Sequence, residues 1–389
     1  MMLRLSKPRL APLCIAVASI AIAPTVSACT SLLYSDANDH YYAGRTMELP
    51  MELPYKVSYF PEGTTFGSQA DKHHALDFTG QNAFVAISVP DPVSGDVKVA
   101  EGLNDKGLTF SVLAFASTEG PVDMVDNTQA VLAAIDLGAW TLSQFDTVDE
   151  VKQALEEQPV LVTSLLPHGL LKTPFHYTLH DATGNSIVIE FANGEQNIID
   201  NPLGVMTNGP EFSWHMTNLN NYTFLSNIDQ SKLELNGVTL AQPDSGIATA
   251  GLPASNTSVG RFVRAVYYSQ FAEKAEDADN AITTLAHVMN NFDRPRGITI
   301  DNRFHDSIEN IAAPGVNNNR VYTSEYTSWT SLIDLQQRHF HIRSYDSLNY
   351  IHFDLDELTD IDEIRHVELK DVVHGPQDAT ASLRQQAIL

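Results

Sequence analysis

Alternating apolar and polar residues predict extended strands along most of the chain. Two such runs, 30–34 and 40–45, flank the polar segment 35–39, and this spacing predicts a β-hairpin. A second hairpin is predicted where the turn 181–185 separates two further runs. The strands expected beyond the first hairpin are 84–89, 97–101, 108–115, 175–179, 186–191, 322–334 and 340–345.

Apolar positions spaced three or four residues apart predict helices between these strands. The expected helices are 128–142, 148–157, 259–274 and 279–291. Thr147 and Glu150 form a capping box at the start of the second helix, and Pro295 lies just beyond the last. Strands interleaved with helix pairs predict a layered α+β domain. The polar tail after Lys370 is expected to be partly flexible.

The first residues have the pattern of a secretory signal peptide. An uncharged apolar run, 10–23, is shorter than the roughly 20 apolar residues that a transmembrane helix needs. Basic residues precede this run and small residues follow it, namely Arg4, Lys7, Arg9, Val26, Ser27 and Ala28. We expect 1–28 to be removed, so that 29–389 is the mature chain, periplasmic or secreted, and begins at Cys29.

A second interpretation of the same residues is a bacterial lipobox. In that case Cys29 is lipidated, its amine is later blocked, and the protein is a lipid-anchored binding protein without catalytic activity. Stable association with a membrane is expected only in this case. Because Cys14 leaves with the leader, Cys29 is the single mature cysteine, which is unusual for an exported chain.

The charge of the chain excludes one class of partner. The formal net charge is −25, and loss of three basic residues with the leader leaves 20 Lys plus Arg against 48 acids, or −28. Such a surface repels nucleic acid and anionic membranes, although salt screens the field over roughly 8 Å. We therefore expect no nucleic-acid partner.

A cysteine at a free N-terminus carries a nucleophile and a base on one residue. The α-amine titrates near 7.7 to 8.0 in model compounds, so part of it is neutral at physiological pH and can accept the thiol proton. This is the N-terminal form of the nucleophile and base arrangement. Such a site still needs donors for the oxyanion of the tetrahedral intermediate.

Five segments of the chain, in order, resemble the choloylglycine hydrolase and penicillin V acylase family, in particular its exported Gram-negative members. The segments are 29–30, 44–48, 101–108, 204–210 and 260–264. The resemblance implies a single domain, 29–389, with the four-layer αββα fold of N-terminal nucleophile hydrolases. It also implies a homotetramer that acts on small-molecule amides without a cofactor.

Site roles follow from the same resemblance. Cys29 corresponds to the nucleophile, and its own amine to the base. Arg45 corresponds to the residue beside the thiol, where its charge favours the thiolate. Glu48 stands where the family usually has an aspartate that hydrogen-bonds the amine, and its side chain is one methylene longer.

The remaining matched residues concern the oxyanion. Asn104 falls where the family has a residue whose backbone N–H faces the oxyanion. Asn208 matches the side-chain oxyanion donor, and Gly209 replaces a frequent second asparagine. Arg261, at the start of a predicted helix, is expected to complete the polar network around Asn208 or the amine.

Other residue patterns concern the acyl pocket and metals. Met47, Met51, Phe115 and Phe212, with Tyr34, lie next to the matched segments and are candidates for lining an acyl pocket. His339 and His341 share a strand face and His73 is followed by His74, but the spacing identifies no third ligand, so no metal is expected. Solvated strand histidines are the simpler interpretation. Motifs for phosphate or dinucleotide cofactors are absent after the predicted strands.

The substrate remains open between two halves of the family. Bile-salt hydrolases are typically cytosolic, whereas exported members are acylases that cut penicillin V and, in some cases, N-acyl homoserine lactones. The predicted leader favours a linear-amide C–N hydrolase that takes phenoxyacetyl or fatty-acyl amides. Conjugated bile salts are the alternative.

Overall fold

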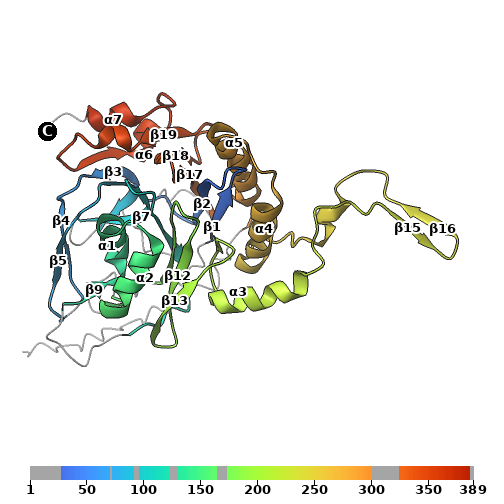
Figure 1. Ribbon diagram of the computed structural model, residues 1–389, viewed down its shortest axis with the longest axis horizontal. Helices are drawn as coiled ribbons and strands as arrows, with labels where there is room; N and C mark the ends of the chain where they lie inside the picture. The colour runs from blue at the N-terminus through green and yellow to red at the C-terminus, as the bar shows by residue number, and fades with distance from the viewer. Residues whose placement is uncertain are drawn as a thin grey trace, which may run out of the picture.

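The computed structural model describes residues 28–70, 72–91, 96–121, 130–163, 173–299 and 324–385. Its strands form two stacked antiparallel sheets with helices on both outer faces (Figure 1). The six-stranded sheet has the order β14 (Val205–Met206), β1 (Cys29–Ser35), β2 (Tyr41–Leu49), β17 (Tyr326–Asp334), β18 (His339–Ser344) and β19 (Ile351–Asp354). The predicted αββα architecture is therefore confirmed.

The eight-stranded sheet forms the second layer of strands. Its order is β13 (Glu195–Asp200), β12 (Ser186–Ala192), β11 (Phe175–His180), β8 (Thr109–Ala114), β7 (Val97–Asn104), β6 (Phe84–Pro90), β3 (Lys56–Phe60) and β20 (Arg365–Glu368). Small two-stranded sheets pair β9 (Leu132–Ala133) with β10 (Val160–Leu161), β4 (Thr65–Ser68) with β5 (Leu76–Thr79), and β15 (Lys232–Leu235) with β16 (Val238–Ala241).

Helices cover the outer face of each sheet. On the eight-stranded sheet, α1 (Leu137–Gln144) packs on β7 and β8, and α2 (Val148–Glu157) on β12. On the six-stranded sheet, α4 (Ser258–Phe271) packs on β1, and α5 (Ala278–Met289) on β2 and β17. The other helices are α3 (Phe212–Asn218), α6 (Leu369–Val372) and α7 (Thr380–Arg384). No helix in the described ranges is long and apolar enough to cross a membrane.

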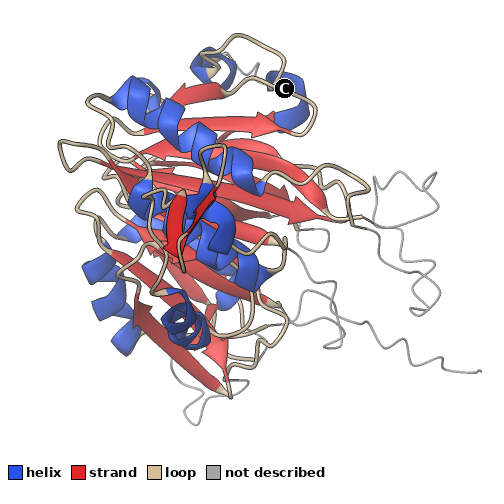
Figure 2. Cartoon of the chain, turned by 90° about the vertical axis from the view of Figure 1, so that its right-hand side faces the viewer, coloured by secondary structure: helices blue, strands red, loops and turns tan. Residues whose placement is uncertain are grey.

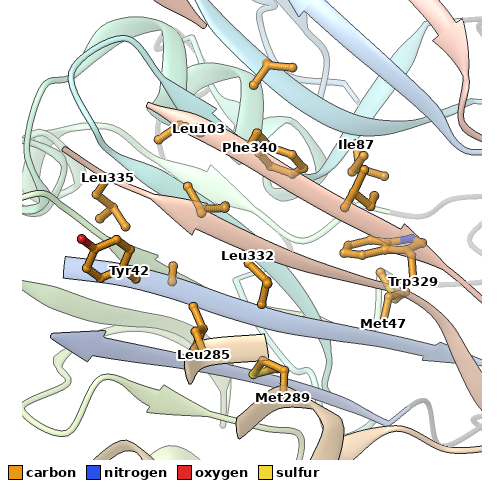
Figure 3. Packing of buried hydrophobic residues seen from close by; sticks show 14 of the residues in the cluster. Tyr42, Met47, Ile87, Leu103, Leu285, Met289, Trp329, Leu332, Leu335 and Phe340 are labelled. Carbon is orange, nitrogen blue, oxygen red and sulfur yellow. The ribbon is translucent and has the colours of Figure 1, made fainter. Parts of the chain in front are cut away.

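The core lies between the two sheets and continues beneath α5. Figure 3 shows Met47 and Trp329 on neighbouring strands, and Leu285 and Met289 of α5 on the other face of β2. Gly44 permits the close approach of α5, because a Cβ at that position would lie 2.8 Å from Met289 Sδ. The lack of a side chain at Gly44 thus lets α5 pack closely on β2.

Most predicted elements are confirmed, with one clear difference. The first hairpin pairs β1 with β2 from Cys29↔Met47 to Ser35↔Tyr41, and Thr147 caps α2 by accepting from Glu150 N at 3.3 Å. The helix predicted from residue 128 instead begins at Leu137, preceded by strand β9 and a 3₁₀ turn, and residues 128 and 129 lie outside the described ranges. Residues 131–134 are fully buried and form an unbroken apolar run. Such a run has no hydrophobic periodicity, so the sequence pattern cannot distinguish a helix from a strand there.

The tail beyond Lys370 forms ordered elements as far as residue 385. Helix α7 packs on β19 and β20, and Leu383 is fully buried. Strands β15 and β16 form an arm that extends away from the sheets in Figure 1 and stands in front of them in Figure 2. The body of the fold and this arm are therefore distinct parts of the structure.

Candidate active site

Cys29 begins β1 at the end of the sheet where β1, β2 and β14 meet. Its side chain is 1% exposed, and its Sγ lies 3.8 Å from Sδ of Met47, the residue opposite it on β2. Its backbone nitrogen donates to Asn208 Oδ1 at 2.7 Å. The first residue of the predicted mature chain is thus enclosed by polar partners from other elements.

Arg45 lies on β2 with its guanidinium between the two sheets. Its Nη2 is 4.0 Å from Cys29 Sγ and donates to the carbonyl of Val112. Its Nε is 3.2 Å from Glu101 Oε2, and its Cζ lies 4.7 Å from the centre of the Trp329 ring. These partners hold the guanidinium so that its Nη2 lies against both the Val112 carbonyl and the thiol.

Asn208 follows β14 and contacts the nucleophile through its side-chain amide. Its Oδ1 accepts from Cys29 N and from Arg261 Nη2, both at 2.7 Å, and its Nδ2 donates to Ala114 O at 2.8 Å. Two donors point at Oδ1 and one acceptor faces Nδ2, so only this orientation of the side-chain amide satisfies all three contacts. Ser258 Oγ fixes the backbone by accepting from Asn208 N at 2.9 Å.

Arg261 reaches the site from the first turn of α4, which Thr257 caps. The side chain is buried, and its Nη1 donates to the carbonyl of Cys29 and, at 2.9 Å, to Thr30 Oγ1. The same guanidinium binds Asn208 Oδ1. Arg261 thus contacts both Asn208 and the first two residues of β1.

Glu48 is fully buried on the helix side of β2. Its Oε1 accepts from Thr327 Oγ1 at 3.2 Å, and its backbone nitrogen donates to Ala28 O at 3.0 Å. The Cys29 nitrogen carries a single hydrogen while Ala28 precedes it, and that hydrogen goes to Asn208 rather than to the predicted acceptor, Glu48. A released amine has additional hydrogens for a second acceptor. Burial raises the pKa of Glu48 to about 7, opposed mainly by Arg261.

The electrostatic environment of the thiol is divided. Burial raises the pKa of Cys29, and the charge of Arg45 is the largest influence that lowers it. Glu48 raises the thiol pKa and Arg261 lowers it further. The two arginines therefore offset part of the desolvation that would otherwise keep a buried thiol protonated.

Asn104 does not lie in this site, so the oxyanion role predicted for it is wrong. Its N–H donates to Leu108 O at 3.0 Å, and its Oδ1 accepts from the backbone nitrogens of Lys106 and Leu108. Its Nδ2 donates to the carbonyls of Leu142 and Phe145. These bonds close the β7–β8 turn, and the site is at the other end of β8, about 20 Å away at 3.4 Å per residue.

Two residues at the site were missed by the sequence prediction. Ala114 ends β8, and its carbonyl accepts from Asn208. In a strand, the N–H and the carbonyl of one residue point to the same edge. The β7–β8 ladder has its last pair at Glu101↔Ser111, so β7 does not cover this edge of β8 at Ala114. The N–H of Ala114 therefore faces the site, as its carbonyl does. Glu101 was missed as the partner of Arg45. Both contacts join elements distant in the sequence, so no local pattern indicated either of them.

The predicted acyl-pocket residues separate into two groups. Met47 contacts the thiol, and Met51 lies partly buried after β2. Phe115 and Phe212 are fully buried core residues, and Phe115 stacks on His176 with ring centroids 4.9 Å apart. Tyr34 is also core and donates to Glu273 O at 2.6 Å. Whether these two phenylalanines line an acyl pocket stays a prediction.

The histidine pairs are not uniformly solvated. His339 is partly exposed, with its Nε2 3.4 Å from Asp354 Oδ2, whereas burial and neighbouring histidines lower the pKa of His341 to about 3. His73 is buried in a turn, and His74 forms an isolated bridge to Ala130. Among the residues described, no group of three or more His, Cys, Asp and Glu side chains is arranged to hold a metal.

A model of the linear amide C–N hydrolases of the choloylglycine hydrolase family matches residues 29–367. The chain belongs to this family. It is 27% identical over 271 residues to a bile salt hydrolase/transferase of Clostridium perfringens, and this alignment covers 70% of this chain and 80% of that protein. It is 26% identical over 347 residues to the penicillin V acylase of Pectobacterium atrosepticum, with 85% and 82% covered.

Solved structures show the same fold. A variant of the conjugated bile acid hydrolase from C. perfringens superposes with a TM-score of 0.73 at 23% identity, covering 87% of this chain and 97% of the other. The penicillin V acylase from Agrobacterium tumefaciens gives a TM-score of 0.68 at 23% identity, covering 90% and 93%. This choloylglycine hydrolase family member is therefore a hydrolase of C–N bonds in linear amides with the N-terminal nucleophile hydrolase fold.

Proposed function

We propose that the mature chain is an exported amidase in which the thiol of Cys29 attacks the substrate and its own α-amine serves as base. This proposal rests on one observation: the backbone nitrogen and the sulfur of Cys29 each lie against a polar side chain. Asn208 Oδ1 orients the nitrogen at 2.7 Å, and Arg45 Nη2 approaches the sulfur at 4.0 Å. The family match that begins at residue 29 supports the same starting point.

The proposed reaction proceeds through an acyl-enzyme. The neutral amine of Cys29 takes the thiol proton as sulfur bonds to the amide carbon. The resulting oxyanion accepts from Ala114 N–H and from the Asn208 Nδ2 hydrogen that does not bind Ala114 O. Collapse breaks the C–N bond, and the leaving amine takes the proton from the α-ammonium. Water then attacks the thioester, releases the carboxylic acid and restores the thiol.

The substrate we propose is an amide of a phenoxyacetyl or fatty-acyl group. The predicted leader and a relative named penicillin V acylase that covers 85% of the chain support this choice. Met47, in contact with the thiol, is flexible enough to pack against either acyl group. Conjugated bile salts are the second candidate, because the relatives include bile salt hydrolases of similar identity, one of which covers 85% of this chain.

One preparation of mature enzyme should separate these substrates. We expect kcat/KM for penicillin V and a long-chain N-acyl homoserine lactone to exceed that for glycocholate and taurocholate, because this ratio measures differential binding of the transition state. A conjugated bile salt that is preferred by tenfold or more, about 1.4 kcal/mol, would replace the acylase assignment with a bile-salt hydrolase.

We also propose that the arm joins the subunits of a homo-oligomer, a tetramer by family resemblance. Leu233 pairs with Leu240 and Leu235 with Val238, so all four side chains share one face of the hairpin, each 50–57% exposed. The opposite face is polar and includes Glu234 hydrogen-bonded to Thr239. An isolated two-stranded hairpin with one apolar face is only marginally stable in water. A second copy that covers this face removes the exposed apolar surface.

Substitutions on the two faces of the arm test the oligomer. The double change Leu233→Glu and Leu240→Glu should lower the mass measured by sedimentation to that of a smaller species. Lys232→Glu, on the polar face, is the matched control and should leave the mass unchanged. A wild-type mature protein that sediments as a monomer at every concentration would contradict the proposal.

A further inference from the structure

Glu101 is a buried carboxylate next to the site that the proposed reaction does not use. It lies on β7, in the sheet opposite Cys29, and is 1% exposed. Its Oε2 is 3.2 Å from Arg45 Nε. The hydroxyls of Ser111 on β8 and Ser331 on β17 lie against it and stabilise its charged form. Arg45 and Ser331 reach the carboxylate from the six-stranded sheet, and Ser111 lies beside it in the eight-stranded sheet.

Arg45 therefore lies between two acidic groups. Its Nε edge faces the Glu101 carboxylate and its Nη2 end faces the Cys29 sulfur, 4.0 Å away. All three side chains are about 1% exposed, so water screens their charges weakly. A negative charge on Glu101 offsets part of the positive charge that Arg45 presents to the sulfur. This effect disfavours ionisation of Cys29.

We propose that Glu101 is a positioning residue that shares Arg45 with the Cys29 thiolate, and that its charge sets how readily the nucleophile ionises. This inference rests on the proposed function, in which Cys29 is the nucleophile. It adds that the thiol and the carboxylate compete for one guanidinium. A carboxylate in this place keeps Arg45 directed at the sulfur while limiting how much thiolate forms in the resting enzyme.

Arg45 links the two acids, because its charge favours the ionised form of both Glu101 and Cys29. Burial raises the pKa of Glu101 to about 7, opposed first by Arg45 and then by the two serines. Below that pH Glu101 is neutral and Arg45 favours the thiolate fully; above it, the carboxylate disfavours the thiolate. The charged groups that act directly on the sulfur are Arg45 and Arg261, which favour the thiolate, and Glu48, which disfavours it.

The ionisation of Cys29 can be measured directly because the mature chain contains no other cysteine. The ultraviolet absorbance of the thiolate is followed against pH in mature protein, with Cys29→Ser as the baseline. Glu101→Gln keeps the shape of the side chain and an oxygen for Arg45 Nε but removes the charge. We expect the apparent thiol pKa to fall by about one unit, so that about tenfold more thiolate is present at a fixed pH below that pKa.

Matched variants separate this effect from a loss of structure. Glu190→Gln alters another buried glutamate, which binds His176 and the Phe212 nitrogen, and should leave the thiol pKa unchanged. In an Arg45→Gln background, Glu101→Gln should shift the thiol pKa much less, because the shared charge is gone. Ser331→Ala leaves the carboxylate ionised in the pH range where the thiol titrates, so it should leave the thiol pKa nearly unchanged.

A purely structural ion pair predicts a different result. Folded Glu101→Gln, or Glu101→Met if the first variant does not fold, would then show a lower Tm with an unchanged thiol pKa, and this result would overturn the inference. The titration requires no substrate. Failure of the proposed function is seen separately, as amide turnover that persists when Cys29 is replaced.

Discussion

Replacing Cys29 with alanine should abolish amide hydrolysis, with kcat/KM reduced by ~10⁴-fold or more, the scale seen when a nucleophile is removed from a hydrolase. The side chain supplies the attacking atom and contributes little core volume, and the Cys29 nitrogen keeps its acceptor, Asn208 Oδ1, in the variant. The loss should therefore appear in turnover and not in folding. Steady-state kinetics and urea unfolding on the same preparation check both parts.

Cys29→Ser is the matched control for the chemistry. It retains an N-terminal nucleophile of similar size, but a hydroxyl is far less acidic than a thiol, so turnover should be severely impaired while the fold is unchanged. Near-normal rates in purified, correctly processed Cys29→Ala would show that another group performs the attack, and the proposed mechanism would then be abandoned.

Asn208→Ala should reduce kcat by ~100-fold or more, the effect of removing one oxyanion donor. The structure gives a second reason for a large loss, because the same side chain orients the Cys29 nitrogen and binds Arg261, each at 2.7 Å. The variant leaves the guanidinium and the amine without their shared acceptor. The pH dependence of kcat should shift as well, since the amine is the proposed base.

Asn104→Ala is the informative comparison for Asn208→Ala. Both residues are buried asparagines in turns with several hydrogen bonds, but Asn104 binds only the β7–β8 turn and the end of α1. It should lose stability, about 1–3 kcal/mol for buried groups left unpaired, and keep kcat. If Asn208→Ala behaved in the same way, with stability lowered and kcat preserved, its proposed role in the chemistry would be wrong.

The residues that sequence patterns placed correctly are those fixed by local structure. The hairpin of β1 and β2 follows from alternation and a polar turn, and it alone brings Arg45 and Met47 near Cys29. Arg261 follows from a helix start that Thr257 caps. In each case the position along the element determines where the side chain points.

The residues that were misplaced depend on how the sheets stack. Asn104 and Ala114 belong to adjoining strands of one hairpin, and only the contact between the two sheets decides which end of that hairpin faces Cys29. Glu101 acquires its partner, Arg45, across the sheet interface, and no local pattern encodes that pairing.

The mature N-terminus tests the central proposal most directly. Protein recovered from the exported fraction should begin Cys-Thr-Ser-Leu-Leu, and its intact mass should equal that of residues 29–389 with no addition, because the mechanism needs a free thiol and a free α-amine on the same residue. A diacylglycerol on Cys29, a blocked amine, or a chain that begins at any other residue would contradict it.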